Sequence, residues 1–496
     1  MNLPPENPSK KQSPKRSEID RNPLNYLNHK RHTPIKRISD ERKIDFKEIY
    51  STSQTQLSAK QAARCLDCGN PYCEWKCPLH NYIPNWLELV AQENYQQAAE
   101  LMYETNPLPE ICGRVCPQDR LCEQACTLNT GFGAVTIGAI EKDISDMALA
   151  KQWRPEVVKL DSNKRVAVVG AGPAGIACAD QLARNGIKAV VYDQYPEIGG
   201  LLTFGIPGFK LEKQVMRTRK AFLEDIGVEF KLNTCVGEDI SFAELKAQYD
   251  SIFLAMGTYQ SVQVNIPGIK NKNVINALDY LIGNINQIEN YQMINFPYRD
   301  LKNKKVIVIG GGDTAMDCVR TAIRQGAELV SCVYRRNQES MPGSPKEVSN
   351  AIEEDVEFLF NLSPLSIEFD TNEELVGLNV ISTKQQIDPE SGKPQLKDIK
   401  GSEQLLKADV IITAFGFRAS PASWFEDAGI KVKKNGLVKM AESTAPGILY
   451  SQKTTVDNVY AGGDMVRGAD LVVTAVAEGI KAAGEIIREI NLNPSS

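Results

Sequence analysis

Eight of the twelve cysteines lie in one short region, between Cys65 and Cys126. The first four are spaced C-x2-C-x4-C-x3-C, the last four C-x3-C-x5-C-x3-C, and a proline directly follows Cys77 and Cys116. Two such thiolate quartets can hold two 4Fe-4S clusters, and two-cluster ferredoxins exchange one ligand between their quartets. We therefore predict two 4Fe-4S clusters with ligands drawn from Cys65, Cys68, Cys73, Cys77, Cys112, Cys116, Cys122 and Cys126. The spacing does not assign each cysteine to a cluster.

Structural zinc is the main alternative, since it also binds four thiolates at short spacings. It would leave the two nucleotide sites described below without an outlet for electrons. A disulfide framework is disfavoured, because the N-terminus has no apolar signal segment and cytosolic thiols stay reduced.

A buried strand, a glycine-rich turn and an apolar helix follow one another in residues 165–179. The turn has the G-x-G-x-x-G pattern that binds a dinucleotide pyrophosphate at a helix N-terminus. Gly170 makes the tight turn, Gly172 lets the backbone approach the phosphates, and Gly175 lets the helix pack against the strand. Asp193 follows the next apolar strand, where an acid accepts a hydrogen bond from a ribose hydroxyl. We assign this site to FAD.

The same pattern returns in residues 305–317, where the turn and helix start contain Gly310, Gly312, Asp313 and Thr314. Here the second strand ends in Arg335 and Arg336 instead of an acid. A guanidinium grips phosphate with two parallel hydrogen bonds, so this pair suits the 2′-phosphate of NADPH. An ordinary exposed strand end is the alternative for the two arginines.

The first nucleotide fold is expected to resume near the C-terminus. Asp464 follows a strand and is expected to accept a hydrogen bond from a ribityl hydroxyl. The helix that begins near Leu471 is expected to direct its N-terminus at the electron-rich end of an isoalloxazine. The glycine-rich loop 197–207 suits a position against a flat ring system.

These patterns predict an α/β fold: two nested Rossmann-like nucleotide-binding domains, for FAD and NADPH, preceded by an all-α iron–sulfur domain. The expected divisions are a basic arm (1–43), an iron–sulfur domain (44–160), an FAD-binding domain (161–262 plus 419–496) and an NADPH-binding domain (263–418). The arm is expected to be a solvated tail or a strap on a partner subunit. Residues 83–101 are expected to form one amphipathic helical stretch, and residues 281–303 a polar connector.

Composition limits the class of protein. A chain of 496 residues is too long for one core. The net charge of -5 gives no electrostatic reason to expect a nucleic-acid partner, and no apolar run is long enough to span a membrane. We expect a cytoplasmic protein.

With these motifs in order, the sequence resembles the small (beta) subunit of bacterial NADPH-dependent glutamate synthase, from about residue 22 to the C-terminus. The resemblance rests on the two cysteine quartets, the two glycine turns, and the segments 196–213, 334–348 and 461–479. It implies FAD, NADPH and 4Fe-4S clusters, with a large (alpha) partner subunit that carries FMN, a 3Fe-4S cluster and the glutamine-hydrolysing site. The further cofactor-binding residues that it implies are Pro173, Ala174, Gly200, Leu201, Gly205, Ile206, Gly257, Gly416, Gly463, Leu471 and Thr474.

The same fold is expected in the N-terminal half of dihydropyrimidine dehydrogenase and in electron-bifurcating NADPH–ferredoxin oxidoreductases. In the dehydrogenase, a glutamine just past the last cysteine binds one cluster. The corresponding position here is Glu141, which departs from that pattern. The resemblance therefore raises the hypothesis that Glu141 is a cluster ligand and Cys112 a spare thiol.

The function expected is that of an electron-input subunit, in which hydride transfer needs positioning and no acid–base side chain. An NADPH–ferredoxin oxidoreductase subunit with another partner is the alternative among enzymes. A nonenzymatic, zinc-stabilised nucleotide sensor is the alternative outside enzymes.

Overall fold

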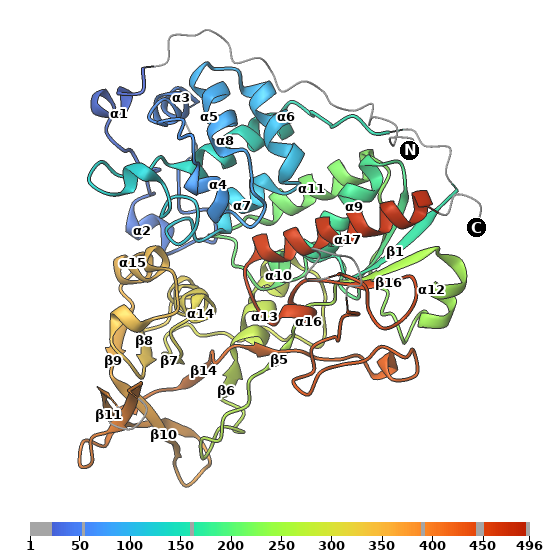
Figure 1. Cartoon of the computed structure of the whole chain (residues 1–496). Helices are drawn as coiled ribbons and strands as arrows, with labels where there is room; N and C mark the ends of the chain where they lie inside the picture. The colour runs from blue at the N-terminus through green and yellow to red at the C-terminus, as the bar shows by residue number, and fades with distance from the viewer. Residues whose placement is uncertain (1–21, 52–54, 159–162, 388–391, 443–450, 493–496) are drawn as a thin grey trace.

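The computed structural model describes residues 22–51, 55–158, 163–387, 392–442 and 451–492. Figure 1 shows three parts: a helical part at the top, a sheet with flanking helices at the right, and a second such sheet at the lower left. The chain enters the second sheet from the first and returns to the first at its end. The predicted α/β fold with an all-α domain in front is confirmed.

The iron–sulfur domain is built from short helices around a buried apolar core. Its helices are α3 (Thr55–Ala62), α4 (Tyr72–Lys76), α5 (Ile83–Ala91), α6 (Tyr95–Thr105), α7 (Pro109–Val115) and α8 (Ile137–Ala150). Trp86 and Met102 are fully buried between them. The single helical stretch expected over 83–101 is wrong, because Glu93 has a φ of +59° and separates α5 from α6.

The first nucleotide-binding sheet is parallel, in the order β16-β4-β1-β2-β3. Its strands are β1 (Arg165–Val169), β2 (Lys188–Tyr192), β3 (Glu229–Lys231), β4 (Ser251–Leu254) and β16 (Val459–Ala461). Its helices are α9 (Pro173–Arg184), α10 (Leu201–Phe204), α11 (Lys213–Asp225), α12 (Phe242–Gln248), α16 (Asp464–Arg467) and α17 (Val472–Leu492). The apolar strands β1 and β4 are buried because helices cover both faces. Helix α17, shown in red in Figure 1, lies along α9 and brings the C-terminal segment back to this sheet.

The second sheet is also parallel, in the order β6-β14-β7-β8-β9. Its strands are β6 (Val274–Asn276), β7 (Lys305–Ile309), β8 (Leu329–Tyr334), β9 (Glu357–Phe360) and β14 (Val410–Thr413), with helices α13 (Ala277–Glu289), α14 (Asp313–Arg324) and α15 (Pro345–Glu353). An antiparallel sheet adjoins it, with β10 (Leu362–Phe369), β11 (Leu375–Ile387), β12 (Pro394–Asp398) and β13 (Gln404–Lys407).

Two short antiparallel strands, β5 (Gln260–Ser261) and β15 (Phe417–Arg418), join the two nucleotide-binding parts. The polar connector expected over 281–303 is wrong in its first third, because α13 continues to Glu289 and buries Leu281, Ile282 and Ile285. The asparagines of this segment alternate with the apolar residues along the helix. The composition alone therefore did not indicate a buried helix. The domain boundaries expected at 43, 160, 262 and 418 stay predictions.

The described part of the basic arm packs against other segments of the same chain. It contains α1 (Asn25–Asn28) and α2 (Ser39–Arg42), and Arg42 is only 1% exposed. In Figure 1, α2 lies directly beside α15 of the NADPH-binding part. Residues 22–43 are therefore not a solvated tail, whereas residues 1–21 lie outside the described residues.

Candidate functional site

One large cavity of about 980 Å³ lies where the two nucleotide-binding parts and the iron–sulfur domain meet. Most of the predicted dinucleotide-binding residues line it: Gly170, Gly172, Pro173, Ala174, Asp193, Gly200, Leu201, Ile206, Gly257, Asp313, Thr314, Gly416, Gly463, Asp464 and Leu471. Others do not line it: Gly175, Gly205, Gly310, Gly312, Arg335, Arg336 and Thr474. The structure thus brings the first glycine turn, and the start of the helix that follows the second turn, to one central cavity.

The glycine turns have the geometry that their spacing predicts. Gly170 has a φ of +106°, and a Cβ there would lie 2.4 Å from the Ala255 carbonyl oxygen. A Cβ on Gly175 would lie 1.8 Å from the Gly170 carbonyl oxygen, so only glycine allows this helix to pack so closely on the strand. Around Gly172, in contrast, a Cβ would meet nothing within 4 Å. The N-terminus of α9 therefore opens on free space, as a phosphate site requires.

The second turn repeats this arrangement. Gly310 has a φ of +149°, and a Cβ there would lie 2.5 Å from the Ala414 carbonyl oxygen. Gly312 is open, and Asp313 and Thr314 begin α14 at the cavity wall. Arg335 and Arg336 are exposed directly after β8, the strand beside the turn. Their position agrees with either interpretation given above, a phosphate grip or an ordinary strand end.

Two predicted acids follow strands of the first nucleotide-binding sheet: Asp193 is buried, and Asp464 is half-buried. Asp193 accepts hydrogen bonds from the backbone amides of Ala171, at 2.6 Å, and Tyr195, at 2.9 Å. Burial nevertheless raises the pKa of Asp193 to about 6 and that of Asp464 to about 7. A further hydrogen-bond donor near each carboxylate would stabilise its ionised form and lower its pKa. A sugar hydroxyl can be that donor.

The sequence analysis missed a charged group in the cavity wall. Lys210 binds Asp317 across the two nucleotide-binding parts, with 2.9 Å between Nζ and Oδ1. Lys346 and Glu347 at the start of α15 also line the cavity. Asp317 follows Asp313 by one helical turn, which puts both acids on one face of α14. Nothing in the local sequence pairs Asp317 with Lys210, because the contact joins segments 107 residues apart.

The turn that follows Cys116 in the iron–sulfur domain also reaches this cavity. Residues 114–120 line it. Arg120 donates to the carbonyl oxygens of Pro342, at 2.7 Å, and Gly343, while Ser344 donates to Asp119 at 3.1 Å. The loop beside the second glycine turn is therefore held by a segment that begins at a predicted cluster ligand.

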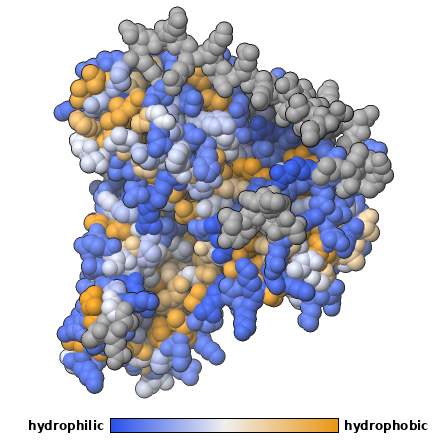
Figure 2. All heavy atoms as spheres, viewed as in Figure 1, coloured by the Kyte–Doolittle hydropathy of each residue, from blue (hydrophilic) through white to orange (hydrophobic). Residues whose placement is uncertain are grey.

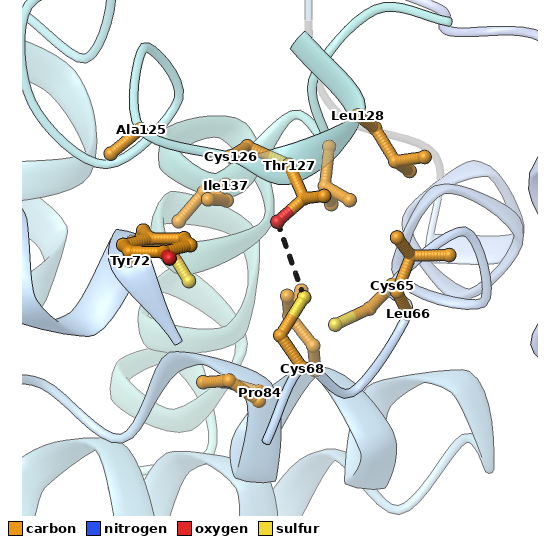
Figure 3. Close-up of a pocket in the computed structure, with 13 residues that line it drawn as sticks. Cys65, Leu66, Cys68, Tyr72, Pro84, Ala125, Cys126, Thr127, Leu128 and Ile137 are labelled. Atoms are coloured by element: carbon orange, nitrogen blue, oxygen red, sulfur yellow. Dashed lines mark hydrogen bonds between the residues drawn. The ribbon is translucent and has the colours of Figure 1, made fainter. Parts of the chain in front are cut away.

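The eight cysteines of the two quartets sort into two smaller cavities. Cys65, Cys68 and Cys73 of the first quartet line one cavity together with Cys126 of the second. Figure 3 shows the sulfur atoms of Cys65 and Cys68 directed into this cavity, with Cys68 hydrogen-bonded to Thr127 at 3.3 Å. Burial raises the pKa of the Cys73 thiol to about 12.

The second cavity is lined by Cys112, Cys116 and Cys122 of the second quartet together with Cys77 of the first. Glu141 lines it too, and its Oε1 accepts hydrogen bonds from Asn81, at 3.1 Å, and Asn106, at 2.9 Å. Burial raises the pKa of Glu141 to about 8, against the effect of the two hydrogen bonds.

The three cavities are adjacent, because neighbouring cavities share lining residues. We call the cavity lined by Glu141 the Cys116 cavity; Cys116 and Gln118 line both it and the central cavity. Ile137 lines both the Cys116 cavity and the Cys68 cavity shown in Figure 3. The order in space is therefore the nucleotide cavity, the Cys116 cavity and then the Cys68 cavity.

In the described part of the chain, no three His, Cys, Asp or Glu side chains are arranged to hold a single metal ion. Among the helices of the described residues, none has the length and apolar character needed to cross a bilayer.

Comparison with known proteins agrees with this division of the chain. Residues 42–153 match the family described as dihydropyrimidine dehydrogenase domain II, 4Fe-4S cluster, and residues 164–479 match the pyridine nucleotide-disulphide oxidoreductase family. Fold and site thus define a pyridine-nucleotide oxidoreductase with an iron–sulfur domain in front of it.

Full-length relatives narrow the class. The chain is 53% identical over 465 residues to the glutamate synthase (NADPH) small chain of Halomonas elongata, covering 94% of this chain and 97% of the relative. It is 49% identical over 471 residues to the Escherichia coli small chain, covering 95% and 99%. The chain belongs to the glutamate synthase (NADPH) small-chain family and is an NADPH-dependent oxidoreductase.

A solved structure supports the fold of the nucleotide-binding parts. Mycobacterium tuberculosis FprA in complex with NADPH matches with a TM-score of 0.54 at 18% identity, over 67% of this chain and 86% of FprA.

Proposed function

We propose that the chain is the electron-input subunit of a glutamate synthase. It oxidises NADPH with FAD and passes electrons through two 4Fe-4S clusters to a large subunit that carries FMN and a 3Fe-4S cluster. That subunit makes L-glutamate from L-glutamine and 2-oxoglutarate. The observation that carries this proposal is the series of adjacent cavities, in which Cys116 and Gln118 belong to both the nucleotide cavity and a thiol cavity.

The first glycine turn and its surroundings fit FAD. The open N-terminus of α9 at Gly172 would hold the pyrophosphate, and Asp193 would accept from the adenosine ribose. Asp464 would accept from a ribityl hydroxyl, and the start of α17 would lie at the ring. When bound, FAD accepts two electrons together and releases them one at a time.

The second glycine turn fits NADPH. The N-terminus of α14 would hold the pyrophosphate, and Arg335 with Arg336 would bind the 2′-phosphate. Because the first turn and the start of α14 line one cavity, the chain needs only to position the two rings, and no side chain has to move a proton for the hydride step.

The thiol cavities fit two clusters with exchanged ligands. Cys65, Cys68, Cys73 and Cys126 would hold the outer cluster. Cys77, Cys116 and Cys122 would hold the inner cluster, with either Cys112 or Glu141 as fourth ligand. We propose Glu141, because Cys112 lies 3.8 Å from the Asn106 amide oxygen and can serve as a buried thiol donor there.

Two serine variants test this ligand choice. Cys112→Ser should keep the full iron and sulfide content, whereas the matched Cys116→Ser should lose one cluster of two. If Cys112→Ser loses a cluster as well, Cys112 is the ligand and the role proposed for Glu141 is wrong.

The side of the iron–sulfur domain at the Cys68 cavity carries exposed aromatic side chains. Tyr72 lines this cavity and is 54% exposed, and Trp75 on the same helix is 64% exposed. In Figure 2, hydrophobic residues also gather over α1, where Leu24 and Leu27 are exposed. Exposed aromatic side chains are enriched in protein interfaces. We propose that the large subunit covers this side of the iron–sulfur domain.

The experiment that tests the function uses the isolated chain, purified anaerobically. It should reduce artificial electron acceptors with NADPH and show no glutamine-dependent turnover. Glutamine-dependent glutamate synthesis by the pure chain would refute the subunit assignment. Copurification with a small flavin subunit instead of a large FMN protein would favour the alternative, an NADPH–ferredoxin oxidoreductase.

A further inference from the structure

Three segments that are distant in sequence meet at one side of the central cavity. They are residues 36–50, the loop 208–212 that precedes α11, and the helix pair α14 and α15. The first comprises the end of the N-terminal arm and the start of the iron–sulfur domain, the second belongs to the FAD-binding part and the third to the NADPH-binding part. We call this set of contacts the arm junction.

Two side chains of the loop, Phe209 and Lys210, contact side chains of α14. Phe209 is 1% exposed, and its ring lies 4.4 Å from the Arg320 guanidinium carbon and 4.0 Å from that of Arg324. Lys210, the next residue, forms the 2.9 Å ion pair with Asp317 in the cavity wall. Asp317, Arg320 and Arg324 share one face of α14, so a single helix face receives the whole loop.

The arm contacts the end of α15 through Arg42. Arg42 donates to Glu353 at 2.8 Å and lies 3.3 Å from Glu354. Glu354 is fully buried and accepts two hydrogen bonds each from Arg320 and Arg324, at 2.7–3.1 Å. Although burial raises the pKa of Glu354, these hydrogen bonds hold it at about 2. The same two arginines therefore contact both the loop and the residues that hold the arm.

Residues 46–49, just after the arm, also contact the loop directly. The Ile49 amide donates to the Phe209 carbonyl oxygen at 3.3 Å, and the Glu48 amide donates to Glu212 at 3.0 Å. A Cβ on Gly208 would lie 2.6 Å from the Phe46 carbonyl oxygen, so the two backbones are in close contact. Residues 36–50, the loop and α14–α15 thus contact one another pairwise.

Other contacts join the nucleotide-binding parts elsewhere around the cavity. Tyr195 and Phe204 of the first part pack with Leu278 and Ile282 of α13 in one buried cluster. Arg120 holds the loop at Gly343. A rotation about the thin β5–β15 connection would have to break the arm junction and both of these contacts together.

We propose that the arm junction fixes the NADPH-binding domain on the FAD-binding domain in one orientation, with Arg42, Phe209 and Lys210 as positioning residues for hydride transfer. This inference rests on the proposed function, which assigns FAD to the first glycine turn and NADPH to the second. It gives the arm a role within its own chain. Hydride transfer then needs no rotation of one domain against the other.

The test uses the full chain with FAD and compares Arg42→Met with Lys43→Met. Both residues lie in the arm, but Lys43 pairs with Asp355, whose side chain is 75% exposed. In rapid-mixing experiments Arg42→Met should lower the limiting rate of flavin reduction by NADPH by roughly 10- to 100-fold, as expected for small misplacements of reacting groups. The NADPH concentration for half-maximal rate should change little, and Lys43→Met should match the wild type.

Amide hydrogen exchange supplies a readout independent of turnover. Arg42→Met should speed exchange in the loop 208–212, with which Arg42 forms no hydrogen bond or ion pair, whereas Lys43→Met should not. Equal flavin reduction and equal exchange in both variants would overturn the proposal. If the wild-type chain fails to reduce its flavin with NADPH, the proposed function fails, and the exchange comparison still tests the junction.

If Arg42→Met does not fold, a second set of variants tests the same junction. Lys210→Met, Asp317→Met and the double variant should lower the limiting rate by similar factors, because removing one partner already breaks the pair. Losses that multiply in the double variant would show that the two residues act separately and would overturn the positioning pair.

Discussion

Replacing Arg219 by Met should loosen the iron–sulfur domain from the FAD-binding domain. Arg219 on α11 is fully buried and donates to both oxygens of Glu110 on α7, at 2.8 and 2.6 Å. It also donates to the Tyr103 hydroxyl at 2.8 Å and lies 4.2 Å from the centre of the Phe222 ring. Removing it leaves the Glu110 carboxylate buried without its cation, which costs about 3–5 kcal/mol of unfolding free energy.

Urea unfolding is a suitable assay, followed by circular dichroism and by the fluorescence of Trp153, which packs 4.9 Å from Tyr103. With a urea slope of about 3 kcal/mol/M, the midpoint of this transition should fall by roughly 1–1.7 M. Arg217→Met is the matched control on the same helix: Arg217 is 41% exposed in its pair with Glu289, and its loss should cost about 0–1 kcal/mol.

A double variant separates the charge from the packing. Arg219→Met with Glu110→Leu removes both charges, so it should be more stable than Arg219→Met alone. The reasoning is refuted if Arg219→Met is no less stable than Arg217→Met, or if the double variant is less stable than Arg219→Met.

Three further predictions concern the clusters, the coenzyme and pH. Cys126→Ser should remove the outer cluster, which it would share with Cys65, Cys68 and Cys73, and spare the inner cluster of Cys116, as iron analysis and electron paramagnetic resonance can show; loss of the inner cluster would contradict the exchanged ligand. Arg335→Ala with Arg336→Ala should weaken NADPH about 10-fold or more and leave NADH unchanged, in binding titrations; equal losses would exclude the 2′-phosphate role. Burial lowers the pKa of Lys213 to about 7 from 10.5. The unfolded chain binds more protons in that interval, so wild-type stability should rise with pH relative to Lys213→Met, as thermal melts between pH 7 and 10 can test.

The glycine turns could be predicted from sequence because their chemistry is local. Gly170 and Gly310 need a positive φ, and Gly175 needs the absence of a Cβ, within a single strand–turn–helix unit. The nesting of the two folds followed from the second unit interrupting the first.

Local patterns also misled where tertiary packing overrides composition. The asparagines in 281–289 suggested a connector, but the apolar residues between them are buried in α13. Glu93 ends a helix through its backbone conformation, with no proline or glycine to announce it. The arm is predicted to be solvated or bound to a partner because residues 1–43 are rich in Pro, Asn, Lys and Arg and have little apolar periodicity.

The contacts that fix the site are long-range, so no sequence pattern announces them. Arg42 meets Glu353 from 311 residues away, and Lys210 meets Asp317 from 107 residues away. The exchange of Cys77 and Cys126 between the thiol cavities was anticipated as a possibility, since two-cluster ferredoxins do the same. Which cysteines exchange became visible only through the two cavities.

The most direct test of the central claim is an anaerobic NADPH titration of the isolated chain, with iron, sulfide, zinc and flavin measured on the same sample. We expect a brown protein with bound FAD and two 4Fe-4S clusters, in which NADPH bleaches the flavin and the visible absorption that remains belongs to the iron–sulfur clusters. A colourless chain, or one that holds zinc and no flavin, would contradict it.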